Sequence, residues 1–310
     1  SASPIAAEGG DALWALHQMG SLADRTAQSA LRHPYPAVRM WAVRLLGDKY
    51  GVHRGLGRPG IGAKESGDLP ADVMGAVLAQ AAREPEAEVR AQFASTARRL
   101  ATAPALRLVD VLAAHDGDVT DPNIPLLIWW VLEAHVGLDR ERVVASFKPA
   151  ALWERPLVKE HLLPRLMRRF ALEGPRQDLI MCAQLLRMAP TRPHTVFLMK
   201  GFEEAYRGRE LVDLPDELSQ AMAASGQTPL ILRVRQGDTA AVNEAVATVR
   251  NKQAPLEERL LYTRAFGEVR RDFAVPALFA VAAGQEPPTL RRTAVVSLMH
   301  YDQADIGPWA

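Results

Sequence analysis

One phrase near the start of the chain recurs further along it, and this recurrence limits the possible folds more than any other sequence feature. The copies are "LRHPYPAVRMWAVRLLGD" from Leu31 and "AREPEAEVRAQFASTARRL" from Ala82. In both, apolar residues recur at intervals of three and four, which is the spacing of one face of an α-helix. The expected buried faces are Val38, Trp41, Ala42, Leu45 and Leu46 in the first copy and Val89, Phe93, Thr96, Ala97 and Leu100 in the second. A looser third copy, "EPPTLRRTAVVSLM", supplies Leu290, Ala294, Ser297 and Leu298.

The spacing between copies indicates a helical repeat with an insertion. Val38 and Val89 are 51 positions apart, whereas HEAT-type helical repeats are about 40–47 residues long. The glycine-rich stretch 50–70, "YGVHRGLGRPGIGAKESGDLP", accounts for the excess as an inserted loop. We therefore expect a flexible segment at 1–12, one helical region at 13–301 and a tail at 302–310. The abrupt start and end also suggest a piece of a longer protein.

The rest of the chain reads as one helical segment after another. The stretch "PLLIWWVLEAHV" is apolar on nearly every side, so we expect burial between neighbouring helices, with Trp129 and Trp130 packing on opposite layers. Pro164 should kink or split its helix. The only candidate strand, "TPLILRVRQG", fits a helix equally well. Helices with one apolar face cover it by stacking, so the sequence predicts an all-α fold, a HEAT/armadillo-like α-solenoid of stacked helical hairpins.

Composition excludes several classes of function. The net charge is +1 with a pI near 7.9, which gives no field strong enough to indicate nucleic acid or an anionic membrane as the main partner. The single cysteine, Cys182, cannot form an internal disulfide, and its apolar surroundings predict a small core residue. The sequence contains no CxxCH haem-attachment motif, GxSxG elbow or HExxH motif, and its apolar runs are shorter than the ~20 residues that a spanning helix needs.

Three patterns resemble ligand sites but fit them poorly. "GLGRPG" matches GxGxxG, yet it follows a helix, and Pro59 lacks the N–H that would face a pyrophosphate. The acidic run "HDGDVTDP" lacks the glycine and glutamate positions of a calcium loop, so Asp121 is better explained as a helix cap. The eight histidines show no metal-ligand spacing and are expected in packing or capping roles. We therefore expect no catalytic, cofactor or metal site in this segment.

The best candidate for a binding patch is a cluster of three arginines. Arg165, Arg168 and Arg169 lie three and four positions apart, which places their guanidinium groups on one helix surface. Such groups bind carboxylates of an acidic partner through paired hydrogen bonds. A solvated face without a partner explains the same pattern.

Several phrases resemble the HEAT-like helical region of large planctomycete proteins described as putative membrane-bound dehydrogenases. The resemblance covers about 13–301, and its most specific parts are "IPLLIWW" and "EHLLPRLMRR". In that family a β-propeller commonly precedes the helical region, and a c-type cytochrome domain often follows it. Related propeller–solenoid proteins resemble membrane coats. The resemblance implies that this chain is the non-redox middle part of such a protein, without haem ligands of its own.

The sequence therefore predicts a non-enzymatic scaffold that contacts other proteins, either flanking domains of its parent or partners in an assembly. The resemblance implies a bacterial parent in the periplasm or at a membrane, with membrane association only through that parent. The alternative is a structural module of a redox protein that positions a c-type cytochrome beside a β-propeller dehydrogenase. A CxxCH motif in the sequence that follows this segment would favour the alternative.

Overall fold

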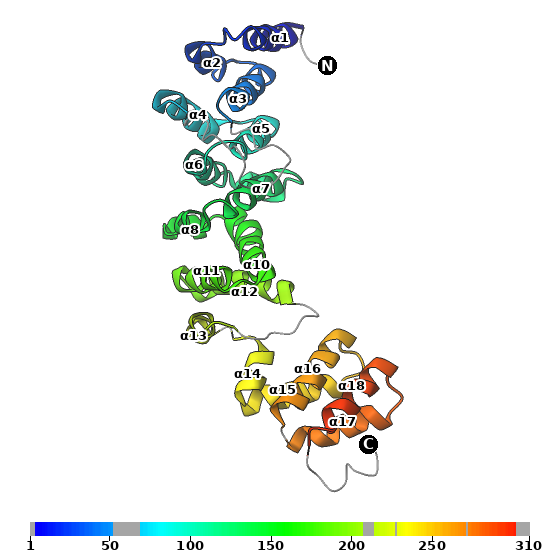
Figure 1. Cartoon of the computed structure of the whole chain (residues 1–310). Helices are drawn as coiled ribbons and strands as arrows, with labels where there is room; N and C mark the ends of the chain where they lie inside the picture. Colours follow the sequence, from blue (N-terminus) through cyan, green and yellow to red (C-terminus); the bar gives the residue numbers. More distant parts are fainter. Residues whose placement is uncertain (1–3, 52–68, 207–213, 227, 271, 302–310) are drawn as a thin grey trace. The chain divides into compact units, whose positions relative to one another are not determined.

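The computed structural model describes residues 4–51, 69–206, 214–226, 228–270 and 272–301 (Figure 1). Within these ranges the chain forms eighteen α-helices and a few short 3-10 or π-helical turns, and none of the described residues belongs to a β-strand. The predicted all-α fold is confirmed. The chain divides into two compact units, which are described separately: unit 1 is Ser1–Phe170 with Arg187–Gly201, and unit 2 is Ala171–Leu186 with Phe202–Ala310.

The described part of unit 1 consists mainly of α-helices. Its helices are α1 (Pro4–Gln18), α2 (Asp24–Ala30), α3 (Pro36–Tyr50), α4 (Ala71–Arg83), α5 (Ala87–Ala97), α6 (Thr102–Leu112), α7 (Ile124–Val136), α8 (Arg140–Ala145) and α9 (Ala150–Trp153). Three further helices run across the boundary between the units, namely α10 (Leu163–Glu173), α11 (Arg176–Met188) and α12 (Arg192–Tyr206).

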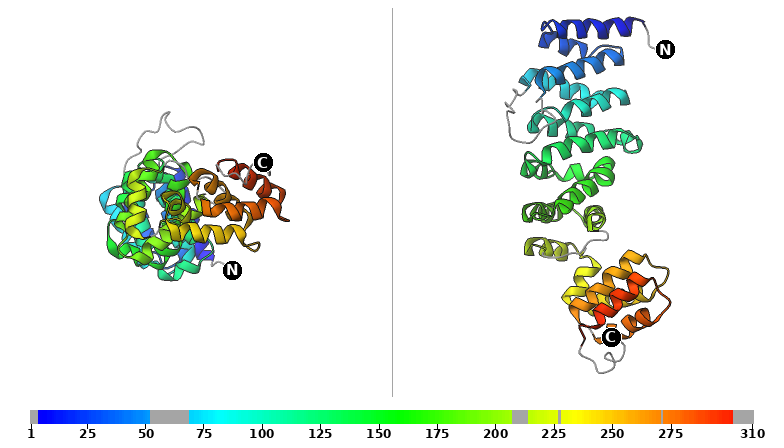
Figure 2. Two further views of the ribbon diagram at one scale, coloured as in Figure 1. Left: turned by 90° about the horizontal axis from the view of Figure 1, so that it is seen from below. Right: turned by 45° about the vertical axis from the view of Figure 1, so that its right-hand side comes forward.

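The helices of unit 1 pack in two rows. In one row α1 contacts α3, α3 contacts α5, and α5 contacts α7; in the other, α2 contacts α4 and α4 contacts α6 (Figures 1 and 2). Contacts between α2 and α3, and of α6 with α5 and α7, join the rows. Each helix therefore touches its near neighbours along the chain, which is the packing expected when one apolar face must be covered by the next helical pair.

Unit 2 repeats this order. Its helices are α13 (Asp216–Ser225), α14 (Leu230–Gln236), α15 (Thr239–Arg250), α16 (Leu256–Val269), α17 (Val275–Ala283) and α18 (Pro288–Leu298). One row consists of α14, α16 and α18, and the other of α15 and α17. The segment considered as a possible strand forms α14.

The apolar faces predicted from the repeated phrase form the core. Every residue named for the second and third copies is buried, and so are four of the five in the first copy. The exception is Trp41, which is half-buried against Gly10 of α1. Helical periodicity therefore identified the packed side of three helices correctly.

An arginine at the fourth helical position explains the repeated Val-Arg pair. Arg39 of α3 donates hydrogen bonds to the carbonyl oxygens of His33 and Pro34 at 3.0 Å, and to the Glu84 carboxylate at 2.8 and 2.5 Å. Arg90, at the same position of α5, donates to the carbonyl oxygens of Glu84 and Pro85 and to the Asp118 carboxylate. Each guanidinium thus joins the turn before its own helix to a carboxylate of a later turn.

The same position is used again in unit 2. Arg259 of α16 donates to the Val249 carbonyl oxygen at 3.0 Å and to the Glu286 carboxylate at 2.8 Å. Arg291 of α18 donates to the Ala282 carbonyl oxygen at 3.1 Å. The repeat is thus marked by its apolar stripe and by an arginine at the fourth helical position, which is buried in α3 and α16, half-buried in α5 and exposed in α18.

The structure differs from the sequence expectations at several points. Helix α1 begins at Pro4, inside the segment expected to be flexible, and the chain forms two units where one region over 13–301 was expected. On α7, Trp129 is buried but Trp130 is 38% exposed, so the two tryptophans do not both pack on neighbouring layers. Most of the stretch 50–70 and the tail 302–310 lie outside the described residues.

Pro164 lies beside a local change of helix type, where a kink or a split was expected. A π-helical turn, Val158–Leu162, directly precedes α10. Because Pro164 has no N–H, the carbonyl of Glu160 loses its usual intrahelical partner, and the backbone widens where that bond is missing.

Candidate functional site

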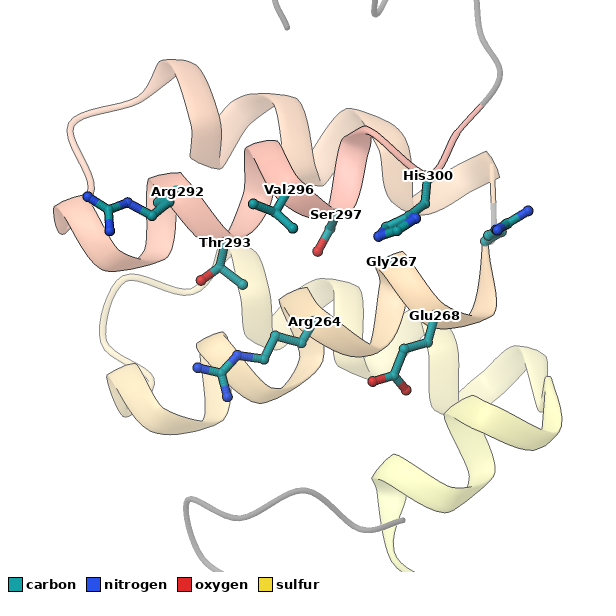
Figure 3. Close-up of a pocket in the computed structure, with 9 residues that line it drawn as sticks. Arg264, Gly267, Glu268, Arg292, Thr293, Val296, Ser297 and His300 are labelled. Carbon is teal, nitrogen blue, oxygen red and sulfur yellow. The ribbon is translucent and has the colours of Figure 1, made fainter. Parts of the chain in front are cut away.

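Helices α16 and α18 of unit 2 form an open groove of about 490 Å³ (Figure 3). The groove follows two neighbouring helices of one row and has long polar side chains on both sides. The residues that line it are Arg264, Gly267, Glu268, Arg270, Arg292, Thr293, Val296, Ser297 and His300.

At the bottom of the groove α16 and α18 approach each other closely, because small residues meet there. A Cβ atom added to Gly267 would lie only 3.0 Å from the Cα and Oγ atoms of Ser297. The Ser297 hydroxyl donates a hydrogen bond to the Thr263 carbonyl oxygen at 2.8 Å, and the Tyr301 hydroxyl donates to the Phe266 carbonyl oxygen at 2.5 Å. These bonds hold α18 close to α16, and the longer side chains on either side form the walls.

The walls carry more positive than negative charge. Arg264, Arg270, Arg292 and His300 are exposed, and among the described residues none forms an ion pair with them. Among the described residues that line the groove, Glu268 is the one that is acidic, and Arg235 already binds its carboxylate at 3.0 Å. The groove therefore presents three guanidinium groups, of Arg264, Arg270 and Arg292, whose hydrogen-bonding capacity is open to a ligand.

This arrangement suits binding better than acid–base chemistry. The Ser297 hydroxyl is committed to a backbone carbonyl, and within the described chain no hydrogen bond joins it to His300. Guanidinium groups bind carboxylates through paired N–H donors, and Val296, which is 50% exposed, adds an apolar contact. The chemistry on offer is recognition of an anionic, partly apolar ligand.

The three arginines predicted as a partner site lie on or beside one surface of α10. Arg165 donates to the carbonyl oxygen of His161 at 3.0 Å and lies 3.1 Å from its Nδ1 atom, so part of its donor capacity is used within the helix. Arg168 is exposed, whereas Arg169 is half-buried. The cluster remains a prediction, with Arg168 its most accessible member.

A second surface, on unit 1, gathers tryptophan and arginine. Arg44 lies over the ring of Trp41 with its Cζ atom 5.1 Å from the ring centroid, and Arg98 lies over Trp130 at 6.0 Å. Trp14, 50% exposed, lies one turn beyond Gly10, against which Trp41 packs. We call these five residues the Trp–Arg face; they belong to the row α1, α3, α5, α7, in which Arg98 directly follows α5.

Three of the histidines and the acidic run have the structural roles expected of them. His115, His161 and His194 each pair a ring nitrogen with a backbone carbonyl oxygen. The Asp121 carboxylate accepts from the amides of Asn123 and Ile124, both at 2.8 Å, at the start of α7. Within the described ranges no group of three histidine, cysteine or acidic side chains is placed to hold a metal ion.

Cys182 is buried, as expected. Burial raises the pKa of its thiol far above the ordinary value, and the charge of Asp178 adds to the shift. The thiol is therefore protonated and unreactive at neutral pH, because the thiolate is the nucleophile.

Sequence reasoning missed both the α16–α18 groove and the Trp–Arg face. For the groove the available signal was the polar side of the third repeated phrase, where Arg292, Val296 and His300 follow one another at intervals of four. For the face it was the adjacent pair Trp129–Trp130, because two neighbouring residues of one helix cannot point to the same side. Neither signal says which side of a helix lacks a neighbouring helix. Only that information decides whether the residues are accessible to a partner.

None of the described helices combines the length and apolar character needed to cross a lipid bilayer. Comparison of the whole chain with protein-family models and with curated proteins finds no match.

Proposed function

We propose that this chain is a non-enzymatic α-solenoid scaffold that contacts other proteins within a larger bacterial protein. The observation that carries the proposal is the two-row packing of successive helices among the described residues of each unit. Proteins built by stacking helical pairs use their long exposed sides as binding surfaces.

The Trp–Arg face supplies a surface of suitable chemistry in unit 1. Tryptophan and arginine are the residue types most enriched among those that dominate binding energy at protein interfaces. The cation–π pairs hold Trp41 and Trp130 beneath guanidinium groups, which reduces the conformational freedom that binding would otherwise remove. Trp14 and Trp130 remain 50% and 38% exposed.

The parent is proposed to be membrane-associated, through parts outside this segment. Support for this comes only from the resemblance of phrases such as "EHLLPRLMRR" to the planctomycete helical region. A scaffold of this kind would hold flanking domains or assembly partners in place and would need no bound cofactor of its own.

Site-specific photo-cross-linking in the parent protein tests the proposal. A photoreactive phenylalanine analogue is placed at position 130, on the Trp–Arg face, and as a control at position 82, which is exposed at the end of α4 in the other row. We expect defined protein adducts from position 130 and few from position 82. Equal labelling from both positions, or no adduct from either, would contradict the proposed contact face.

A further inference from the structure

We infer that the groove between α16 and α18 binds an extended acidic segment of a partner protein, a peptide in which carboxylates and apolar residues alternate along one side, that is, at every second position. The inference rests on the proposed scaffold function and names a second contact surface, separate from the Trp–Arg face. The first argument for it is charge complementarity. Arg264 and Arg292 stand on opposite walls, and no described acidic residue pairs with either of them (Figure 3).

The spacing of the groove residues suits an extended peptide. Arg292, Val296 and His300 follow at intervals of four, so at about 1.5 Å per helical residue they span roughly 12 Å. An extended chain advances about 3.3 Å per residue, so four residues cover this length. Carboxylates four positions apart, a distance of about 13 Å, would then reach the cations near the ends of the groove. The apolar side chain midway between them points to the same side of the extended chain and meets Val296.

The conformation of Arg270 is a second and independent observation. Arg270 ends α16 with φ 49°, and it is the only non-glycine residue with positive φ in the described chain. At the four other positive-φ positions of the described residues, Gly20, Gly174, Gly226 and Gly237, the sequence uses glycine. A left-handed conformation is unfavourable for a side chain with a Cβ. An arginine held there, at the mouth of a basic groove, indicates a role for its guanidinium beyond ending the helix.

A peptide explains the site better than a nucleic acid does. The cations lie along the groove with Val296 between them, so they do not converge on one phosphate. The chain as a whole has a net charge of only +1, which gives little of the long-range attraction on which phosphate-backbone binding depends.

The test is fluorescence anisotropy with the full chain and a labelled peptide in which glutamate and valine alternate at every second position, with serine at the positions between them. Controls are the same peptide with glutamine for glutamate, and a single-stranded oligonucleotide. We expect the glutamate peptide to bind at least tenfold more tightly than either control. Glutamine-peptide binding of equal strength, tighter oligonucleotide binding, or the absence of peptide binding would overturn the inference.

Three variants locate the binding. Arg292→Gln should weaken peptide binding about five- to tenfold, as should Arg270→Gly, which also removes an unfavourable backbone conformation and so leaves the melting temperature unchanged or raised. Arg250→Gln is the matched control, because Arg250 is exposed on α15 in the other row of unit 2. This variant should bind the peptide as tightly as the unsubstituted chain does. Equal loss in the Arg250 variant would show unspecific attraction and contradict the site. Failure here leaves the cross-links from position 130 unaffected, so it is distinguishable from failure of the proposed scaffold function.

Discussion

Arg39 shows how a single side chain ties together segments that are distant in sequence. Its guanidinium satisfies two carbonyl oxygens of the turn before α3 and both carboxylate oxygens of Glu84, which follows α4. Glu84 is only 1% exposed. Burial raises the pKa of its carboxyl, but hydrogen bonds from Arg39, Gln80 and the Glu86 amide outweigh burial and hold this pKa below its ordinary value. The pair is therefore charged, desolvated and fully hydrogen-bonded.

Breaking this pair should destabilise unit 1 strongly. Arg39→Met leaves the Glu84 carboxylate buried with fewer donors, which should lower the free energy of unfolding by about 3–5 kcal/mol. Urea denaturation of the full chain measures the change. The control is Lys159→Gln, which removes a partly exposed partner 3.6 Å from Glu154 and should cost less than about 1 kcal/mol. Similar losses in both variants would mean that the buried Arg39–Glu84 pair stabilises unit 1 no more than the partly exposed Lys159–Glu154 pair does.

The same pair predicts how stability depends on pH. Because the folded-state pKa of Glu84 is lowered, its contribution is complete above the ordinary value of 4.5 and disappears as the pH falls below that value, through the folded pKa. Stability of unit 1 should therefore decrease on acidification below about pH 4.5. Glu84→Gln should reduce this decrease, which urea midpoints measured between pH 6 and 3 can detect. An unchanged slope in the variant would assign the acid sensitivity to other carboxyls.

At the scale of helices, close approach depends on where small residues stand. A Cβ added to Gly201 of α12 would lie 1.9 Å from the carbonyl oxygen of Pro164, a backbone atom that cannot move aside easily. Gly75 of α4 has no described atom within 4 Å of the same virtual position. Two glycines that look alike in the sequence thus have opposite roles.

Alanine substitution separates these two roles. Gly201→Ala should destabilise unit 1 by about 3 kcal/mol or more, because α12 must move away from the turn at Pro164. Gly75→Ala should stabilise it by about 0.5–1 kcal/mol, since alanine favours a helix interior. Thermal denaturation followed by circular dichroism gives both signs. A neutral Gly201→Ala would show that the helices tolerate the extra methyl by separating.

The sequence predicted the helices and their buried faces better than the surfaces that they expose. The faces of α5 and α18 were identified completely because helical periodicity reports which side of a helix is apolar, whatever covers it. Trp130 was misplaced because α7 is apolar nearly all round, so periodicity could not choose its uncovered side. The partners of Arg39 and Arg259 were not predictable, since each lies in a turn that only the folded chain brings near. The groove depends on Gly267 and Ser297 meeting, which is likewise a tertiary event.

At the scale of the whole molecule, each described unit is a succession of helices stabilised chiefly by near neighbours. Such chains respond to damage locally, because the most extensive contacts of the described helices are with helices close to them in the sequence. The ion pairs of Arg39, Arg90 and Arg259 also act between near neighbours, because each joins turns that belong to adjacent helical pairs. The proposed scaffold function follows from this, because stacking leaves long faces free for partners.

Hydrogen–deuterium exchange of the full chain carrying Arg39→Met tests this central claim most directly. If near neighbours supply the stability, exchange should accelerate in α3, α4 and α5, with a smaller change in α1 and α7. Helices α16–α18 should stay as protected as in the unsubstituted chain. Uniform acceleration across all the described helices would contradict the account, because it would mean that the chain unfolds as one cooperative body.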